Sequence, residues 1–329
     1  MPPTPTSSVR ILSPLEECLH GLDDAAVMRL LSYMEVDDIV HFAKTSSSTR
    51  SFCQLFAHTA WNFNAFFNDW FANTEAFREA LSESRALVSR SQVLQFFERT
   101  SYANSDLDLY LQAGGFETIN VFVKSQGYER QSQDSSRLRQ QYSRLCNLLR
   151  ATRGNCIVDV ISYRRRYPSL VDINQDGSSR MVQVIVVSGI PVCFILFEYH
   201  SSAVINYITS NEAVCVFPQF TLLHKKSFIT PNGKMCEKWR EKYISRGFEL
   251  VGDTDLSRLP LSHKCWVFDC HTWVVPFAGD GVNSLGKRPL KALHPSSIPM
   301  DIMFVSGGQG FSACFEGAAV SSMSLNDVD

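Results

Sequence analysis

Two carboxylates, Asp106 and Asp108, stand two positions apart in the stretch YANSDLDLYL, which covers residues 102–111. Side chains alternate between the two faces of a β-strand, so in a strand these carboxylates share one face and three leucines share the other. The leucine face is typical of a protein core. A carboxylate pair is rarely buried without a counter-charge, and its oxygens suit divalent cations such as Mg²⁺. The spacing therefore indicates a strand that presents an acidic pair able to bind a metal ion.

Short elements on either side must position this pair. Residues 85–89 (RALVS) favour a strand, and a helix is expected to begin at Ser91. Further strands are expected at residues 156–163 (CIVDVISY) and 180–187 (RMVQVIVV), and a helix before the first of them is expected to end at Gly127. The alternation of strands and helices predicts an α/β or α+β arrangement for this part of the chain.

Before residue 73 the apolar residues recur with helical spacing, and an aromatic stripe runs from Phe63 to Phe71. The sequence thus predicts an α+β protein in which an all-helical N-terminal module precedes a mixed-sheet α/β domain. The expected organisation is a disordered N-terminus (1–18), the helical module (19–73), the α/β domain (74–290) and a loosely structured C-terminal segment (291–329).

The bulk composition narrows the function classes. A formal net charge of -2 gives no basic field that would favour nucleic acid or an anionic membrane. The apolar run at residues 181–197 is broken by Gln183, Gly189 and Pro191, so no transmembrane segment is expected. Ten cysteines without a regular framework, and no secretory signal, indicate reduced thiols in the cytoplasm or the nucleus.

The segment LDDAAVMRLLSYMEVDDIVHFAKTSSSTRSF, residues 22–52, resembles an F-box, apart from Asp23, where that family usually has proline. The resemblance implies that apolar side chains of these helices bind the Skp-type adaptor of a cullin ubiquitin ligase. The helical pattern alone leaves an alternative, in which the same side chains form the core of a small bundle. The residues expected to contact the adaptor are Leu22, Val27, Leu30, Leu31, Met34, Ile39 and Phe42.

The segment from Leu87 to Leu111 is similar to the signature of polymerase-β-like nucleotidyltransferases. In that family a strand ends in Gly-Ser, a helix follows, and the next strand carries an Asp-x-Asp pair that binds Mg²⁺ beside an NTP. Ser91 matches the family's serine, and Asp106 and Asp108 match the metal-binding pair. The nucleotide-binding position would be formed by Ser91 and Arg90.

Two departures from the nucleotidyltransferase pattern bear on activity. Arg90 stands where the family has glycine, so a cationic side chain occupies a position meant for close approach of phosphate to the backbone. The family also has a third carboxylate on a neighbouring strand, and the strand at 180–187 offers only Gln183 at its centre. Asp159 in the strand at 156–163 is the nearest alternative.

The combination is similar to a group of fungal F-box proteins in which an F-box precedes a nucleotidyltransferase-like fold. We therefore expect a substrate receptor of an SCF-type ubiquitin ligase whose second domain recognises a protein target and does not catalyse a reaction. Two alternatives stay open, an active Mg²⁺-dependent nucleotidyltransferase and a regulatory module that binds nucleotide without catalysis. Zinc binding at residues 263–271 and nucleic-acid binding at Arg164–Arg166 are not favoured.

Overall fold

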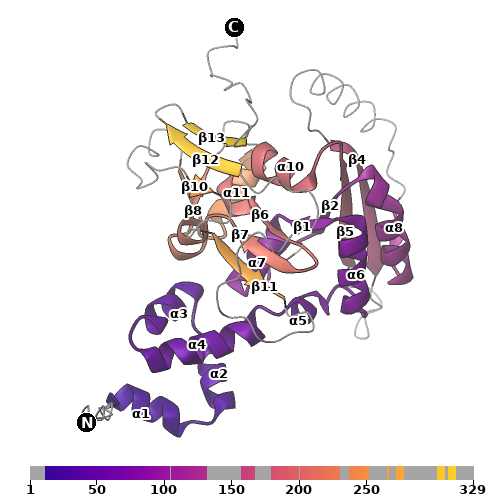
Figure 1. The fold of residues 1–329 in the computed structure, drawn as a ribbon. Helices are drawn as coiled ribbons and strands as arrows, with labels where there is room; N and C mark the ends of the chain where they lie inside the picture. The colour runs from indigo at the N-terminus through magenta and orange to yellow at the C-terminus, as the bar shows by residue number, and fades with distance from the viewer. Residues whose placement is uncertain are drawn as a thin grey trace, which may run out of the picture. The chain divides into compact units, whose positions relative to one another are not determined.

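The computed structural model describes residues 12–103, 105–131, 157–166, 179–199, 201–229, 237–251, 265–266, 272–277, 302–307 and 310–315. The protein combines helices with a mixed sheet, so the predicted α+β class is confirmed (Figure 1). The chain forms two compact units, Met1–Asn62 and Phe63–Asp329. In the described part of the chain, no helix combines the length and the apolar composition that a membrane crossing would require.

The described residues of the first unit, 12–62, form four helices, α1 (Pro14–Gly21), α2 (Asp24–Ser32), α3 (Val36–Ala43) and α4 (Ser47–Ala60). Side-chain oxygens of Ser13, Asp23 and Ser46 accept hydrogen bonds from the first turns of α1, α2 and α4. The prediction that residues 1–18 are disordered is wrong for α1. The physical reason is a capping box between Ser13 and Glu16, with Pro14 at the first helical position.

The second unit is built on an eight-stranded sheet with the strand order β11-β7-β6-β1-β2-β5-β4-β3. β2 and β5 are parallel, and every other neighbouring pair in this sheet is antiparallel. The strands are β1 (Leu87–Ser89), β2 (Leu107–Gln112), β3 (Glu129–Arg130), β4 (Ile157–Arg166), β5 (Ser179–Val187), β6 (Asn206–Ile208), β7 (Glu212–Cys215) and β11 (Trp273–Pro276).

Helices and two small sheets complete the second unit (Figure 1). The α-helices are α5 (Phe63–Phe67), α6 (Thr74–Ser84), α7 (Ser91–Glu98), α8 (Phe116–Ser125), α10 (Pro191–Glu198) and α11 (Glu237–Ile244). Three short turns of helix are η1 (Ala113–Gly115), η2 (Ser202–Val204) and η3 (Gln219–Leu223). The small sheets pair β8 (Lys226–Phe228) with β9 (Glu249–Val251), and β10 (Cys265–Trp266) with β12 (Ile302–Gly307) and β13 (Gly310–Phe315).

The hairpin β12–β13 corrects the prediction that residues 291–329 are loosely structured. That prediction gave most weight to the glycine and serine content of the segment. Both strands nevertheless contain aromatic or β-branched residues, among them Ile302, Phe304 and Phe311, which favour extended structure.

An aromatic cluster explains why the second unit begins at Phe63 rather than at residue 74, where the sequence placed the domain boundary. The ring of Phe63 lies 5.8 Å from that of Phe77 in α6 and 5.1 Å from that of Phe277. Phe71 lies 5.0 Å from Phe122 in α8. Helix α5 therefore packs with the second unit through its phenylalanine side chains.

One glycine of the second unit lies where no side chain fits, which gives a testable prediction. A Cβ atom on Gly115 would lie 2.3 Å from the carbonyl oxygen of Ser84, whereas a Cβ atom on Gly114 would meet nothing within 4 Å. We expect Gly115→Ala to lower the free energy of unfolding by about 1–3 kcal/mol, because the backbone at Ser84 must move. Urea unfolding measures the effect, and Gly114→Ala is the matched control. Equal stabilities of the two variants would contradict the prediction.

Candidate functional site

The acidic pair lies where three strands meet. β2 carries Asp108, and Asp106 directly precedes the strand. In the sheet, Asp108 pairs with Ser89 of β1 on one side and with Gln183 of β5 on the other. All three leucines of β2 are fully buried, and Asp108 and Tyr110, which alternate with them along the strand, are buried as well.

Asp106, Asp108 and Gln183 line a pocket of about 260 Å³. The strand β1 leads into Arg90 and Ser91, and Ser91 begins α7, so the order strand, helix, Asp-x-Asp strand is present as the sequence predicts. Helix α11 provides another wall of the pocket. The lining residues are Arg90, Ser91, Asp106, Asp108, Gln183, Val204, Trp239, Lys242 and Tyr243.

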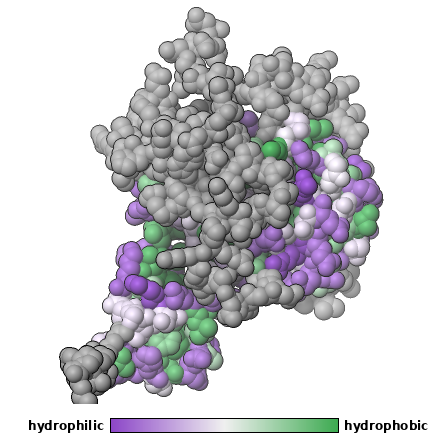
Figure 2. All heavy atoms as spheres, in the orientation of Figure 1, coloured by the Kyte–Doolittle hydropathy of each residue, from purple (hydrophilic) through white to green (hydrophobic). Residues whose placement is uncertain are grey.

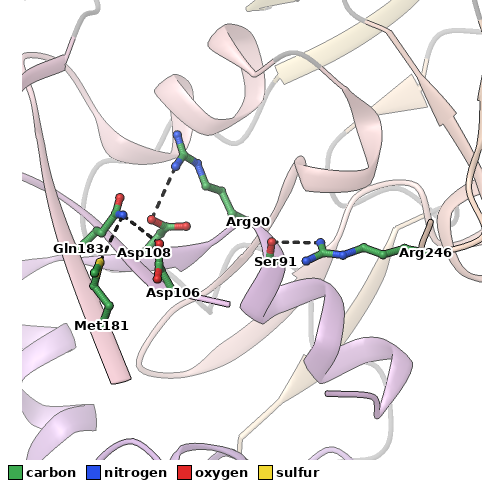
Figure 3. A network of polar contacts seen from close by, with 7 residues as sticks. All are labelled: Arg90, Ser91, Asp106, Asp108, Met181, Gln183 and Arg246. Carbon is green, nitrogen blue, oxygen red and sulfur yellow. Dashed lines mark hydrogen bonds and ion pairs between the residues drawn. The ribbon is translucent and has the colours of Figure 1, made fainter. Parts of the chain in front are cut away.

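Arg90 has a backbone conformation that glycine adopts more readily, with φ 65° and ψ -139°. A residue with a side chain in such a region costs of order 1–3 kcal/mol, and strain of this kind concentrates at functional sites. The guanidinium Nη1 of Arg90 lies 3.6 Å from Asp108 Oδ1 (Figure 3). Its Cζ lies 5.7 and 5.6 Å from the ring centres of Tyr110 and Tyr199, within cation–π range.

Burial dominates the acid–base properties of the pair. Asp108 is buried, and desolvation raises its pKa to about 6, although Arg90 and Lys242 act in the opposite direction. Repulsion from Asp106 adds to the rise. Desolvation also raises the pKa of Asp106, against the attraction of Lys242 and Arg90 and the hydrogen bond from Gln183. Both carboxylates are thus held in an environment that disfavours their charge.

Gln183 contacts the pair as a hydrogen-bond donor. Its Nε2 donates to Asp106 Oδ2 at 3.0 Å (Figure 3). A carboxylate at the same position would repel Asp106 and offer oxygen ligands to a cation. The glutamine instead directs one N–H group at the oxygen that a metal ion would need.

Helix α11 and the residues after it bring basic and aromatic side chains that the sequence analysis did not select. Arg246 Nη1 donates to Ser91 Oγ at 3.2 Å, and its Cζ lies 3.8 Å from the ring centre of Tyr102. Desolvation and the nearby Arg246 lower the pKa of Lys242. The residues between the acidic pair and α11 number more than a hundred, and no spacing rule connects segments so far apart in a sequence.

A divalent cation does not fit this arrangement. Mg²⁺ requires six oxygen ligands in near-octahedral geometry. Here Gln183 donates an N–H to Asp106, and the positive charge of Arg90 lies 3.6 Å from Asp108 Oδ1, which has no hydrogen-bond partner among the described residues. Among the described residues, no group of three or more histidine, cysteine, aspartate or glutamate side chains is arranged to hold a metal ion.

Asp159, the expected alternative for a third carboxylate, does not lie with the pair. On β4 it is Ser162 that pairs with Gln183, whereas Asp159 pairs with Val186. Three residues along a strand correspond to roughly 10 Å. Asp159 is also absent from the residues that line the pocket.

The residues expected to contact an adaptor fall into two groups in the helical unit. Val27, Leu31 and Ile39 are buried in the core of this unit, and Met34 and Phe42 are partly buried. Leu22 and Leu30 are exposed, as is Tyr33, which has 76% of its surface accessible. Figure 2 shows hydrophobic residues among the hydrophilic ones on the surface of this unit, in the lower part of the view.

Two further groups of residues singled out by composition have no described member in the pocket lining. Cys265 begins β10, and the other members of the cluster at 263–271, His263, Cys270 and His271, lie outside the described residues. Arg165 is in β4, with its guanidinium 4.7 Å from the ring centre of Tyr128.

Comparisons with known proteins return no match, whether with protein-family models, with curated proteins or with solved structures. Any functional assignment therefore depends on the residues and geometry described above.

Proposed function

We propose that this protein is an F-box-type substrate receptor, in which the helical unit binds the Skp-type adaptor of a cullin ubiquitin ligase. The second unit would be a nucleotidyltransferase-like domain that recognises a protein target and does not catalyse a reaction. Such a receptor would act in the cytoplasm or the nucleus. The observation that carries the adaptor-binding half is the exposure of Leu22, Leu30 and Tyr33 on a unit that already has its own buried core.

Exposed apolar side chains on short helices suit a partner that offers a hydrophobic groove. Interface anchors are commonly aromatic or aliphatic side chains that enter such a groove. The buried Val27, Leu31 and Ile39 support the helices and would not touch the partner. The proposed contact surface is therefore smaller than the sequence pattern implies and is centred on Leu22, Leu30 and Tyr33.

The contacts of Arg90 and Gln183 support the part of the proposal in which the second unit does not catalyse a reaction. Nucleotidyltransferases of the polymerase-β-like family, which this chain resembles in sequence, use carboxylates to hold two Mg²⁺ ions. Here Asp106 accepts a hydrogen bond from Gln183 at 3.0 Å, and Asp108 Oδ1 lies 3.6 Å from the Arg90 guanidinium in an ion pair, with no hydrogen-bond partner among the described residues. We expect the purified protein to show no Mg²⁺-dependent nucleotide transfer.

A binding assay with the purified full-length chain and a Skp-type adaptor tests the proposal. We expect wild type to bind and the double variant Leu22→Asp, Leu30→Asp to lose at least tenfold in affinity, since a charge in a desolvated contact costs more than 1.4 kcal/mol. Leu55→Asp is the matched control, because Leu55 is equally exposed but lies on α4. Surface plasmon resonance gives the affinities.

Two outcomes would contradict adaptor binding. One is the absence of any complex between wild type and the adaptor. The other is equal affinity of wild type and the double variant while circular dichroism shows both to be folded. Substitution of Leu31 is unsuitable for this purpose, because Leu31 is fully buried and its loss would unfold the unit.

A further inference from the structure

The lining of the pocket beside the acidic pair contains two basic and two acidic side chains, and a third basic side chain lies against its wall. Arg90 and Lys242 line it, and Arg246 is hydrogen-bonded to Ser91 in its wall. Among the described residues, the acidic side chains in the lining are Asp106 and Asp108. Burial disfavours the charge of both aspartates and also that of Lys242. With Arg246 included, the basic side chains exceed the acidic ones by one, which favours an anionic ligand.

Arg90 is held in place before any ligand arrives. Its guanidinium lies beside Asp108 and over the rings of Tyr110 and Tyr199. Its side chain nevertheless keeps 38% of its surface accessible. Guanidinium groups fixed in this way recognise phosphate or carboxylate oxygens through paired hydrogen bonds.

Arg90 places a positive charge beside Asp108, as a divalent cation held by the acidic pair would do. A metal ion in such a site contacts the aspartates on one side and ligand oxygens on the other. Arg90 makes the first of these contacts through Nη1, 3.6 Å from Asp108 Oδ1. Gln183 directs a further N–H at Asp106. In this arrangement Asp108 binds the guanidinium of Arg90, a cation that belongs to the chain itself.

We propose that Arg90 takes the place of a divalent cation, and that the pocket binds a small polyanion without any metal ion. The ligand class is one that carries adjacent oxyanions, such as a diphosphate group, which could contact Arg90 and Lys242 together. This inference concerns the second unit alone and does not depend on adaptor binding by the helical unit.

Calorimetric titration of the full chain with inorganic pyrophosphate tests the inference. The titration is done once with EDTA and once with excess Mg²⁺. We expect wild type to bind pyrophosphate in EDTA, and the affinity to fall or stay the same when Mg²⁺ is added. Binding that requires Mg²⁺, or no binding of pyrophosphate in either buffer, would overturn the inference.

Variants identify the residues that bind the probe. Arg90→Gly and, separately, Lys242→Ala are each expected to weaken pyrophosphate binding in EDTA by roughly tenfold or more, since each removes a charged hydrogen-bond donor. The matched control is Arg85→Gly, because Arg85 also has a positive φ, of 53°, and is absent from the pocket lining. Lys242 is exposed, so its alanine variant tests the inference even if Arg90→Gly does not fold. Wild-type affinity in a folded Arg90→Gly or Lys242→Ala variant would overturn it.

A variant that gains metal binding provides an independent test of whether Arg90 replaces a divalent cation. The double variant Arg90→Gly, Gln183→Asp removes the cation and adds the missing carboxylate. We expect electron paramagnetic resonance to detect bound Mn²⁺ in this variant and none in wild type. Bound Mn²⁺ in wild type, or none in the folded double variant, would contradict the replacement of a metal ion by Arg90.

Discussion

Replacement of Phe77 by alanine is expected to lower the free energy of unfolding by about 3–5 kcal/mol, the range for truncation of a fully buried phenylalanine. Phe77 in α6 has no exposed surface. Its removal would leave a cavity among rings that come from two other helices, α5 and α8, and from the loop before α6, so no single side chain could move to fill it. The rings in contact with it are those of Phe63, Phe67, Phe71 and Phe122.

Urea unfolding of the full chain, followed by tryptophan fluorescence, gives the free energies for this comparison. Val121→Ala is the matched control, since Val121 is exposed on the neighbouring helix α8 and its truncation should change the stability by less than about 0.5 kcal/mol. A loss of less than about 1 kcal/mol for Phe77→Ala would mean that the aromatic cluster is loosely packed.

Local patterns in the sequence were sufficient to predict the elements that carry the site. The strand at residues 85–89, the helix from Ser91 and the strand with the acidic pair are all present, because each has a strong period of its own. Gly127 has φ 78° and follows α8, as the expected helix end requires. The two strands predicted around Asp159 and Gln183 are β4 and β5.

The long-range parts of the site could not be predicted from the same patterns. Nothing local indicates that Lys242 and Arg246 approach Ser91, since that contact depends on how α11 packs. The register between β4 and β5 likewise decides that Ser162, and not Asp159, lies beside Gln183. Register depends on pairing across the sheet, which periodicity within one strand does not specify.

Helical periodicity also could not separate core from contact surface in the first unit. Val27, Leu30 and Leu31 follow the helical pattern i, i+3, i+4, yet Leu30 is exposed and the other two are fully buried. The stripe that a helix buries depends on where its neighbours lie, and the pattern of one helix contains no information about them.

The second large effect concerns pH. The pKa of Asp108 is raised to about 6 in the folded protein, from 3.8, mainly by desolvation. A carboxyl group whose pKa is higher in the folded state binds its proton more tightly there, so its ionisation lowers stability as pH rises from about 4 to about 6. Asp108→Asn removes this ionisation. The variant should therefore match wild type below pH 4 and exceed its unfolding free energy by on the order of 2–3 kcal/mol above pH 7.

Urea unfolding of wild type and Asp108→Asn at a series of pH values between 4 and 8 measures this difference. Asparagine keeps the shape of the side chain, and Arg90, with 38% of its side-chain surface accessible, can be hydrated when its partner is neutral. Asp69→Asn is the matched control, because Asp69 is largely exposed beside Arg180 and should give a small difference at every pH. If Asp108→Asn were less stable than wild type at pH 7.5, the attraction of Arg90 and Lys242 would outweigh desolvation, and Asp108 would be ionised throughout this range.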